Sequence, residues 1–197
     1  KLNFAENLFS KKDDTKAITF ISENGYKINK SWNELYYSTS RIINFLKKNN
    51  IKKNEIIAAY LPNIIETVEF FLATSAIGAI WTSCSPDFGT NGVIERFSQT
   101  NPKILIIADR YFYNGKEINV INRLPEILKK IKIIKHVILI NYPGQKMLKV
   151  RKYKKVKIYK INDIKKIRNT EIKFKKFDFN KELAILYSSG TTGKPKC

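Results

Sequence analysis

The chain has 197 residues, which is enough for one domain with a sizeable core, and a formal net charge of +20 at pH 7. Its two cysteines and single histidine are too few for a disulfide scaffold or a Cys/His metal cluster. The sequence begins without an apolar signal core, and the apolar run from Phe70 to Trp81 is too short to cross a bilayer. We therefore expect a cytoplasmic protein with no membrane partner and no metal site within these residues.

The first fifty residues predict a hairpin followed by a helix. Residues 17–21 and 26–30 are strand-like, and Asn24-Gly25 between them is the dipeptide typical of a tight hairpin turn. Ser31 and Glu34 form a capping-box pattern, which indicates a helix that starts there. An apolar stripe continues to the lysine-rich last turn of this helix, so the helix is expected to bury one face.

The middle of the chain alternates between strands and helices. Apolar runs predict buried strands at residues 55–61, 80–83, 104–108 and 137–140. Helices are expected at residues 63–76, 91–100 and 118–132. Asn63 and Glu66 repeat the capping-box pattern, Gly78 is a suitable helix exit, and Pro125 interrupts the last helix. The alternation is typical of an α/β fold, a doubly wound and mostly parallel sheet with flanking helices.

Residues 144–180 are rich in lysine. They hold 14 basic and 3 acidic residues, so +11 of the net charge lies in 37 residues and +9 in the other 160. One strand is expected at Val156 to Tyr159 and a short helix at Asn162 or Asp163, within a surface connection. Aromatic residues between the lysines leave a basic nucleic-acid-binding module as an alternative. Arginine is better suited than lysine to bidentate contacts with phosphate and guanine, but lysine outnumbers it 31 to 6. We therefore expect no specific nucleic-acid partner.

The most informative segment is residues 187–196, Tyr-Ser-Ser-Gly-Thr-Thr-Gly-Lys-Pro-Lys. Its glycines allow the backbone to turn sharply and to present N–H groups to an anion, and its hydroxyl and lysine side chains add donors. It is not a P-loop, because Gly190 and Gly193 are too close together and Lys194 precedes a proline. The segment predicts a loop that wraps phosphate; a flexible turn without a ligand is the alternative.

The whole of this segment resembles the phosphate loop of the adenylate-forming superfamily, in particular its acyl-CoA synthetases. Upstream segments extend the resemblance, and they are most similar to the acetoacetyl-CoA synthetases of that superfamily. These segments are residues 2–8, 58–63, Glu66, 78–89, 101–103, Asp109 and 111–116. The similarity covers most of residues 1–120 and 174–197. Members of the family are several times longer, so residues 1–197 are expected to be the N-terminal part of an AMP-binding (adenylation) domain.

The resemblance implies an ATP-dependent acid–thiol ligase. The full-length protein would use Mg²⁺ and ATP to form an acyl-adenylate from acetoacetate, and would then transfer the acyl group to CoA. The implied ligands of the ATP phosphates are Ser188, Ser189, Gly190, Thr191, Thr192, Gly193, Lys194 and Lys196. An acetyl- or propionyl-CoA synthetase and a noncatalytic remnant are the alternatives. No catalytic residue is assigned within this chain, and the chain alone is expected to be inactive.

Gly115 and Lys116 form a second candidate site. They follow a predicted strand that ends at Ala108, and ligands of open α/β sheets bind beyond the carboxyl ends of strands. In the resembled acyl-CoA synthetases the matching turn lies near the CoA nucleotide, which implies a CoA contact here. An ordinary Asn-Gly turn is the alternative. Cys84 and His136 are interpreted as a packed thiol and a surface residue.

Overall fold

The computed structural model describes residues 1–188 and 195–197. Its centre is a six-stranded sheet in the order β10-β4-β3-β5-β8-β9, and every neighbouring pair is parallel. The strands are β3 (Ile56–Tyr60), β4 (Ile80–Cys84), β5 (Ile104–Ala108), β8 (His136–Ile140), β9 (Lys157–Lys160) and β10 (Ala184–Ile185). The predicted doubly wound α/β architecture is confirmed.

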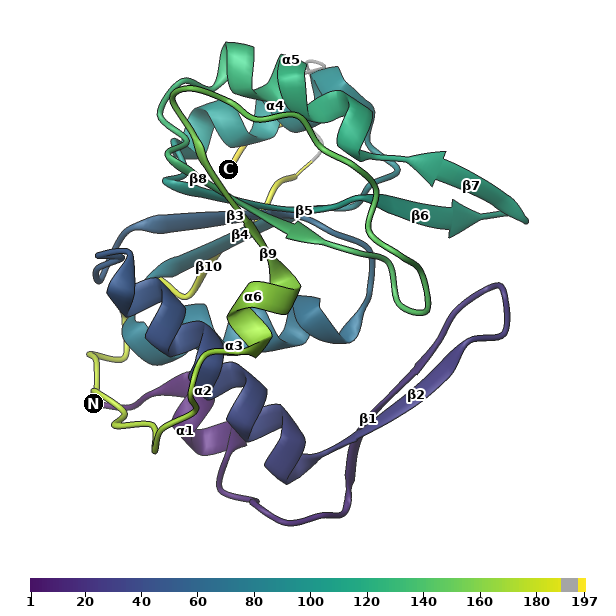
Figure 1. The fold of residues 1–197 in the computed structure, drawn as a ribbon. Helices are drawn as coiled ribbons and strands as arrows, with labels where there is room; N and C mark the ends of the chain where they lie inside the picture. The colour runs from purple at the N-terminus through teal and green to yellow at the C-terminus, as the bar shows by residue number, and fades with distance from the viewer. Residues whose placement is uncertain (189–194) are drawn as a thin grey trace.

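Helices cover both faces of the sheet (Figure 1). One face carries α1 (Phe4–Leu8), α2 (Trp32–Lys48), α3 (Ile65–Ile77) and α6 (Ile161–Lys165). The other carries α4 (Thr90–Thr100) and α5 (Leu124–Lys130), which follows the short 3-10 helix η1 (Ile121–Arg123). All five residues of β5 are fully buried, as expected for a central strand that is covered on both sides. No helix in the described part of the chain is long and apolar enough to cross a membrane.

The first hairpin and its following helix form as predicted. β1 (Lys16–Ile21) pairs antiparallel with β2 (Lys27–Ser31), and Gly25 in the turn has a φ of 79°. At the start of α2, the Glu34 amide donates to the Ser31 hydroxyl at 3.2 Å, and the Ser31 amide donates to the Glu34 carboxylate at 2.8 Å. Both halves of the predicted capping box are therefore present, and they satisfy two amides that the helix leaves unpaired.

The second predicted capping box is wrong. The residue at the N-cap of α3 is Ile64, and no side chain caps that end. Asn63 lies one residue too early to cap, and the Thr67 hydroxyl instead donates to the carbonyl of Pro62 at 2.8 Å. The helix begins without a cap because tertiary packing stabilises its first turn, where Ile64 and Ile65 are both buried.

The helix predicted at residues 118–132 is also wrong in its first half. Residues 110–119 form a second hairpin of β6 (Arg110–Tyr113) and β7 (Lys116–Asn119). The helix α5 begins only at Leu124, so Pro125 lies in its first turn. Proline is well suited to that position, because the first amides of a helix have no partner within it. Pro125 therefore starts this helix rather than interrupting it.

The lysine-rich residues 144–180 contribute to the sheet. The expected strand is β9, which pairs with β8 at the sheet edge, and the expected short helix is α6. The buried carboxylate of Asp109, which follows β5, accepts hydrogen bonds from the amides of Tyr142 at 3.0 Å and Leu148 at 2.9 Å. Asp109 also lies 3.4 Å from the guanidinium of Arg110. This carboxylate thus ties the beginning of the lysine-rich segment to the end of a core strand.

Gly78, the residue after α3, lies very close to the ring of Phe177. Its φ is 71°, and a Cβ there would lie 2.5 Å from the ring of Phe177. Gly25 also has a positive φ, but a Cβ there would meet nothing within 4 Å. We expect Gly78→Ala to lower the free energy of unfolding by about 2 kcal/mol, from backbone strain and overpacking together. Gly25→Ala is the matched control and should cost about half as much, since only the backbone term remains. Equal shifts in the urea midpoint of the two variants would contradict the role of Phe177.

Candidate functional site

The predicted phosphate loop follows β10 at the edge of the sheet where all the parallel strands end. β10 pairs with β4, with Ile185 opposite Thr82, so the chain that leaves β10 lies beside the end of β4. The ends of β3 and β5 are at the same edge, and the β6–β7 hairpin extends from it (Figure 1). Ligands of open α/β sheets bind at this edge.

The two arms of the loop are joined at its base. The Ser188 amide donates to the Lys196 carbonyl at 2.9 Å, and the Lys196 amide donates to the Ser188 carbonyl at 3.2 Å. One residue earlier, the hydroxyls of Tyr187 and Thr82 lie 2.8 Å apart, which attaches the first arm to β4. The other six predicted phosphate ligands, Ser189, Gly190, Thr191, Thr192, Gly193 and Lys194, lie outside the described residues.

Helix α4 holds the second arm and places an arginine beside the first. The side-chain amide of Gln99 donates to the Pro195 carbonyl at 3.0 Å. The guanidinium carbon of Arg96 lies 3.9 Å from the ring centroid of Phe88 and 5.9 Å from that of Tyr187. Arg96 makes no ion pair with any carboxylate in the described part of the chain. A cation that stacks on aromatic rings therefore lies next to the base of the loop.

A second arginine fixes the turn that follows β4. Arg123 of η1 donates to the hydroxyl of Tyr60 and to the carbonyls of Pro86 at 2.8 Å and Phe88 at 3.0 Å. The Tyr60 hydroxyl, at the end of β3, also donates to the Phe88 carbonyl at 2.6 Å. The turn is thereby attached to its neighbouring strand and to η1. Sequence reasoning missed both arginines, although their rarity in a lysine-rich chain was a usable signal.

The tyrosine and thiol groups at this edge are held neutral by burial. Burial raises the pKa of Tyr111 to about 12, and a hydrogen bond with Asp87 adds to that effect. Burial also raises the pKa of Tyr187, and it raises the pKa of the Cys84 thiol to about 12. The raised pKa values keep these groups protonated and uncharged near neutral pH. The carboxyl edge offers hydrogen-bond donors and positive charge, which are the groups that bind an anion.

The raised pKa of Cys84 has a direct chemical consequence. Alkylation requires the thiolate, and a thiol with a pKa of about 12 is almost entirely protonated at pH 8. We expect iodoacetamide to leave Cys84 unmodified in the folded protein and to modify it in urea, as measured by mass spectrometry of the peptide that contains it. Alkylation at equal rates in both conditions would show that Cys84 is not buried as described.

The second candidate site lies at the tip of the β6–β7 hairpin. Asn114 and Gly115 have φ values of 50° and 70°, as in a tight hairpin turn. The Gly115 amide donates to the carboxylate of Glu23 in the first hairpin at 3.3 Å, and Lys116 is exposed. Gly115 and Lys116 are thus at the carboxyl edge, as expected from their place after β5. Both the CoA contact and the ordinary turn remain compatible with this position.

No metal site is formed by the described residues, among which no three His, Cys, Asp or Glu side chains lie close enough together to hold an ion. The groups described at the carboxyl edge are mainly amides, hydroxyls and cations, which can all donate hydrogen bonds to an anion.

The chain matches known proteins over its whole length. The profile of a family described as "AMP-binding enzyme" matches residues 5–197. Acetoacetyl-CoA synthetase of Xenopus tropicalis is 37% identical over 218 residues, and acetoacetyl-coenzyme A synthetase of Rhizobium meliloti is 36% identical over 197 residues. Each alignment covers 100% of this chain and 30% of the relative. A solved acetoacetyl-CoA synthetase from Streptomyces lividans superimposes with a TM-score of 0.88 and 30% identity, over 98% of this chain and 29% of that one.

These similarities agree with the site described above. The matched region includes the loop after β10, both arms of which are joined at the carboxyl edge. The chain spans about 30% of the length of the curated relatives it matches. The matched residues and the parallel sheet together show that the chain belongs to the AMP-binding enzyme family.

Proposed function

We propose that the protein containing this chain is an ATP-dependent acid–thiol ligase that acts on acetoacetate. The observation that carries the proposal is the pairing of Ser188 with Lys196 at the carboxyl ends of the strands, which is the edge where ligands of open α/β sheets bind. The names of the relatives support acetoacetate as the acid. Acetate and propionate are the alternative acids.

The first step would be adenylation. A carboxylate oxygen of acetoacetate attacks the α-phosphorus of ATP, the bond from that phosphorus to the bridging oxygen breaks, and pyrophosphate leaves with the bond electrons. Both reactants are anionic, so donors and cations must hold the β- and γ-phosphates and stabilise the departing charge. We assign this role to Ser188, Lys196 and the six loop residues between them other than Pro195. Mg²⁺, when bound with ATP, would supply further charge neutralisation, and we assign it no ligand in this chain.

The second step would be thioester formation. The CoA thiolate attacks the acyl carbon of the adenylate, the carbon–oxygen bond to phosphate breaks, and AMP leaves. Gly115 and Lys116 are proposed to contact the nucleotide part of CoA, because they lie on a turn beyond the end of β5. A lysine contributes a mobile charge suited to phosphate. Lys116→Ala should then raise the KM for CoA without changing exchange between ATP and pyrophosphate; an unchanged KM would support the ordinary turn.

The ligase proposal is tested by exchange of labelled pyrophosphate into ATP, measured on the full-length protein. Exchange should require a carboxylic acid, and acetoacetate should support the highest kcat/KM in a panel that includes acetate and propionate. Exchange that is fastest with acetate would favour the alternative acids. No exchange with any short acid would exclude the proposed reaction.

Residues 1–197 alone are expected to be inactive in the same assay. The relatives are more than three times as long as this chain, so it spans only the first part of the residues that the proposed reaction would use. Pyrophosphate release by this chain above the level of a variant with Lys194 and Lys196 replaced by alanine would contradict this expectation. Both cysteines are free thiols, which supports our proposal of a cytoplasmic location.

A further inference from the structure

A groove rimmed by lysines lies at the amino ends of the sheet strands. The predicted phosphate loop follows the opposite, carboxyl ends. The volume of the groove is about 330 Å³. Its floor is apolar and consists of Ile43, Ile51, Ala76, Ile77, Ile172 and Phe177. Its rim carries five lysines, namely Lys47, Lys52, Lys53, Lys173 and Lys175. A volume of this size is typical of small-molecule sites.

The groove is separate from the candidate nucleotide site. Lys52 and Lys53 lie just before β3, and Ile77 ends α3 just before β4. These residues are at the amino ends of the strands, whereas Ser188 follows the carboxyl end of β10. Nothing in the proposed ligase reaction uses this edge of the sheet.

The five lysines of the groove lack an ion-pair partner in the part of the chain that the structure describes. None of them makes an ion pair with a carboxylate in residues 1–188 or 195–197, whereas the nearby Lys176 and Lys181 pair with Glu6 and Glu182. Like charges gathered around one groove repel one another within a Debye length. Binding of an anion would relieve that repulsion, so the groove is electrostatically complementary to a ligand with more than one negative charge.

The walls of the groove are held in place by hydrogen bonds. The segment that carries Lys173 and Lys175 is attached to α2, because the Ile172 amide donates to the Tyr36 hydroxyl at 2.8 Å. Its other end is attached through Asn3, whose side-chain amide lies 2.9 Å from the Lys175 carbonyl and 3.1 Å from the Ala76 carbonyl. A groove with fixed walls loses little conformational freedom when a ligand binds.

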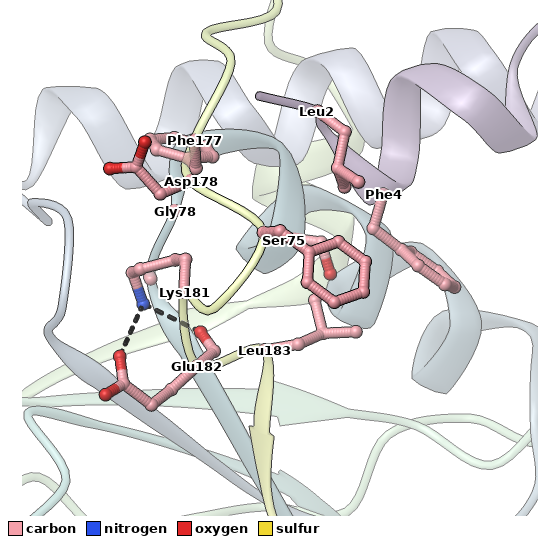
Figure 2. A pocket seen from close by; sticks show the side chains of 11 residues that line it. Leu2, Phe4, Ser75, Gly78, Phe177, Asp178, Lys181, Glu182 and Leu183 are labelled. Carbon is pink, nitrogen blue, oxygen red and sulfur yellow. Dashed lines mark hydrogen bonds and ion pairs between the residues drawn. The ribbon is translucent and has the colours of Figure 1, made fainter.

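Phe177 lines both this groove and a second, mainly apolar cavity, which Figure 2 shows. Its ring lines both, and the ammonium of Lys53 lies 5.7 Å from the ring centroid. The second cavity has a volume of about 120 Å³, and its lining includes the apolar Leu2, Phe4 and Leu183 as well as the charged Asp178, Lys181 and Glu182. Figure 2 shows these apolar side chains gathered on one side of the backbone segment that carries Phe177. Phe177 thus lies between the lysine-rimmed groove and the mainly apolar second cavity.

We propose that this groove binds an anionic amphiphile, a single alkyl or acyl chain with a phosphate head. The phosphate lies among the lysines, where its two negative charges meet mobile ammonium groups. The chain lies over the apolar floor and passes Phe177 toward the second cavity, where burial of its methylenes adds affinity. A bare phosphate would leave the floor exposed, and a neutral chain would leave the lysines unpaired.

The test is calorimetric titration of the full-length protein with dodecyl phosphate, kept below its critical micelle concentration, in the absence of ATP and acid. We expect saturable binding at one site. The variant with Lys52, Lys53 and Lys173 replaced by serine should bind at least about tenfold more weakly, since each exposed charge contributes a fraction of the total. The matched control replaces three exposed lysines across the sheet, Lys129, Lys130 and Lys132, by serine and should change the affinity less than about twofold.

Two further ligands test the two halves of the site. Inorganic phosphate and the neutral dodecyl maltoside should each bind much more weakly than dodecyl phosphate. Equal binding of either one, an equal loss of affinity in the control variant, or binding only to anionic phospholipid vesicles would overturn the proposal. Because the titration involves no turnover, its failure would leave the proposed ligase reaction untouched, and a failure of that reaction would leave this site untouched.

Discussion

Replacing Lys196 by alanine in the full-length protein is expected to slow acid-dependent exchange between ATP and pyrophosphate about a hundredfold. Removal of one preorganised donor from a transition state in which charge develops costs about 10²–10³ in rate. The backbone of Lys196 closes the loop by pairing with Ser188, and this pairing does not depend on the side chain. The variant therefore removes a charge without opening the loop.

The effect should fall on kcat rather than on the KM for ATP, because the β- and γ-phosphates gain negative charge as the bond to the α-phosphorus breaks. Lys196→Arg should restore part of the rate, since it keeps the charge. Lys129→Ala, on the exposed side of α5, is the matched control and should leave exchange unchanged. A loss that Lys196→Arg does not relieve at all would show that the charge is not what matters.

Replacing Asp109 by alanine should lower the free energy of unfolding by at least about 2 kcal/mol, because each of two amides that lose their acceptor costs about 1–3 kcal/mol. The carboxylate of Asp109 accepts the amides of Tyr142 and Leu148 and lies beside the Arg110 guanidinium, and only 1% of it is exposed. Without it, two amides lose their acceptor, whereas the Arg110 guanidinium keeps the Glu117 carboxylate at 3.1 Å and the Lys146 carbonyl at 2.9 Å. Hydrogen exchange should accelerate most at the amides of Tyr142 and Leu148.

Asp178→Ala is the matched control for this prediction. The side chain of Asp178 is exposed and makes no hydrogen bond or ion pair within the described residues, so its removal should shift stability by less than about 0.5 kcal/mol. Asp109→Asn should give an intermediate loss, because the amide keeps one acceptor oxygen but loses the charge. If Asp109→Ala unfolds at the same denaturant concentration as Asp178→Ala, the carboxylate does not anchor the lysine-rich segment.

The elements that the sequence predicted well are those decided by local patterns. The hairpin around Gly25, the helix that starts at Ser31 and the apolar strands all follow from residues that are close in sequence. The β6–β7 hairpin was missed because Ile118, Ile121 and Leu124 have helical spacing. The helix starts late because the amides of Val120 and Ile121 donate to the carbonyl of Asp109, a contact that no local pattern reveals.

The sequence indicated the residue types of the candidate site, but not which other residues lie around it. The glycines, hydroxyls and lysines of residues 188–196 indicate phosphate binding by themselves. The positions of Arg96 and Arg123 depend on contacts with residues far away in sequence, such as the 63-residue separation between Arg123 and Tyr60. Such contacts are decided by the sheet order, which places β10 next to β4 and could not be read from the alternation of strands and helices alone.

The pairing of β10 with β4 also has a consequence for the order in which the chain folds. Tyr187 and Pro195 form hydrogen bonds with Thr82 and Gln99, which are synthesised about a hundred residues earlier. Contacts of such high sequence separation close slowly, and only after the segments between them have collapsed. The pairing of Ser188 with Lys196 can therefore form only after β4 and α4 have folded, so slow folding of these two elements should delay closure of the loop base.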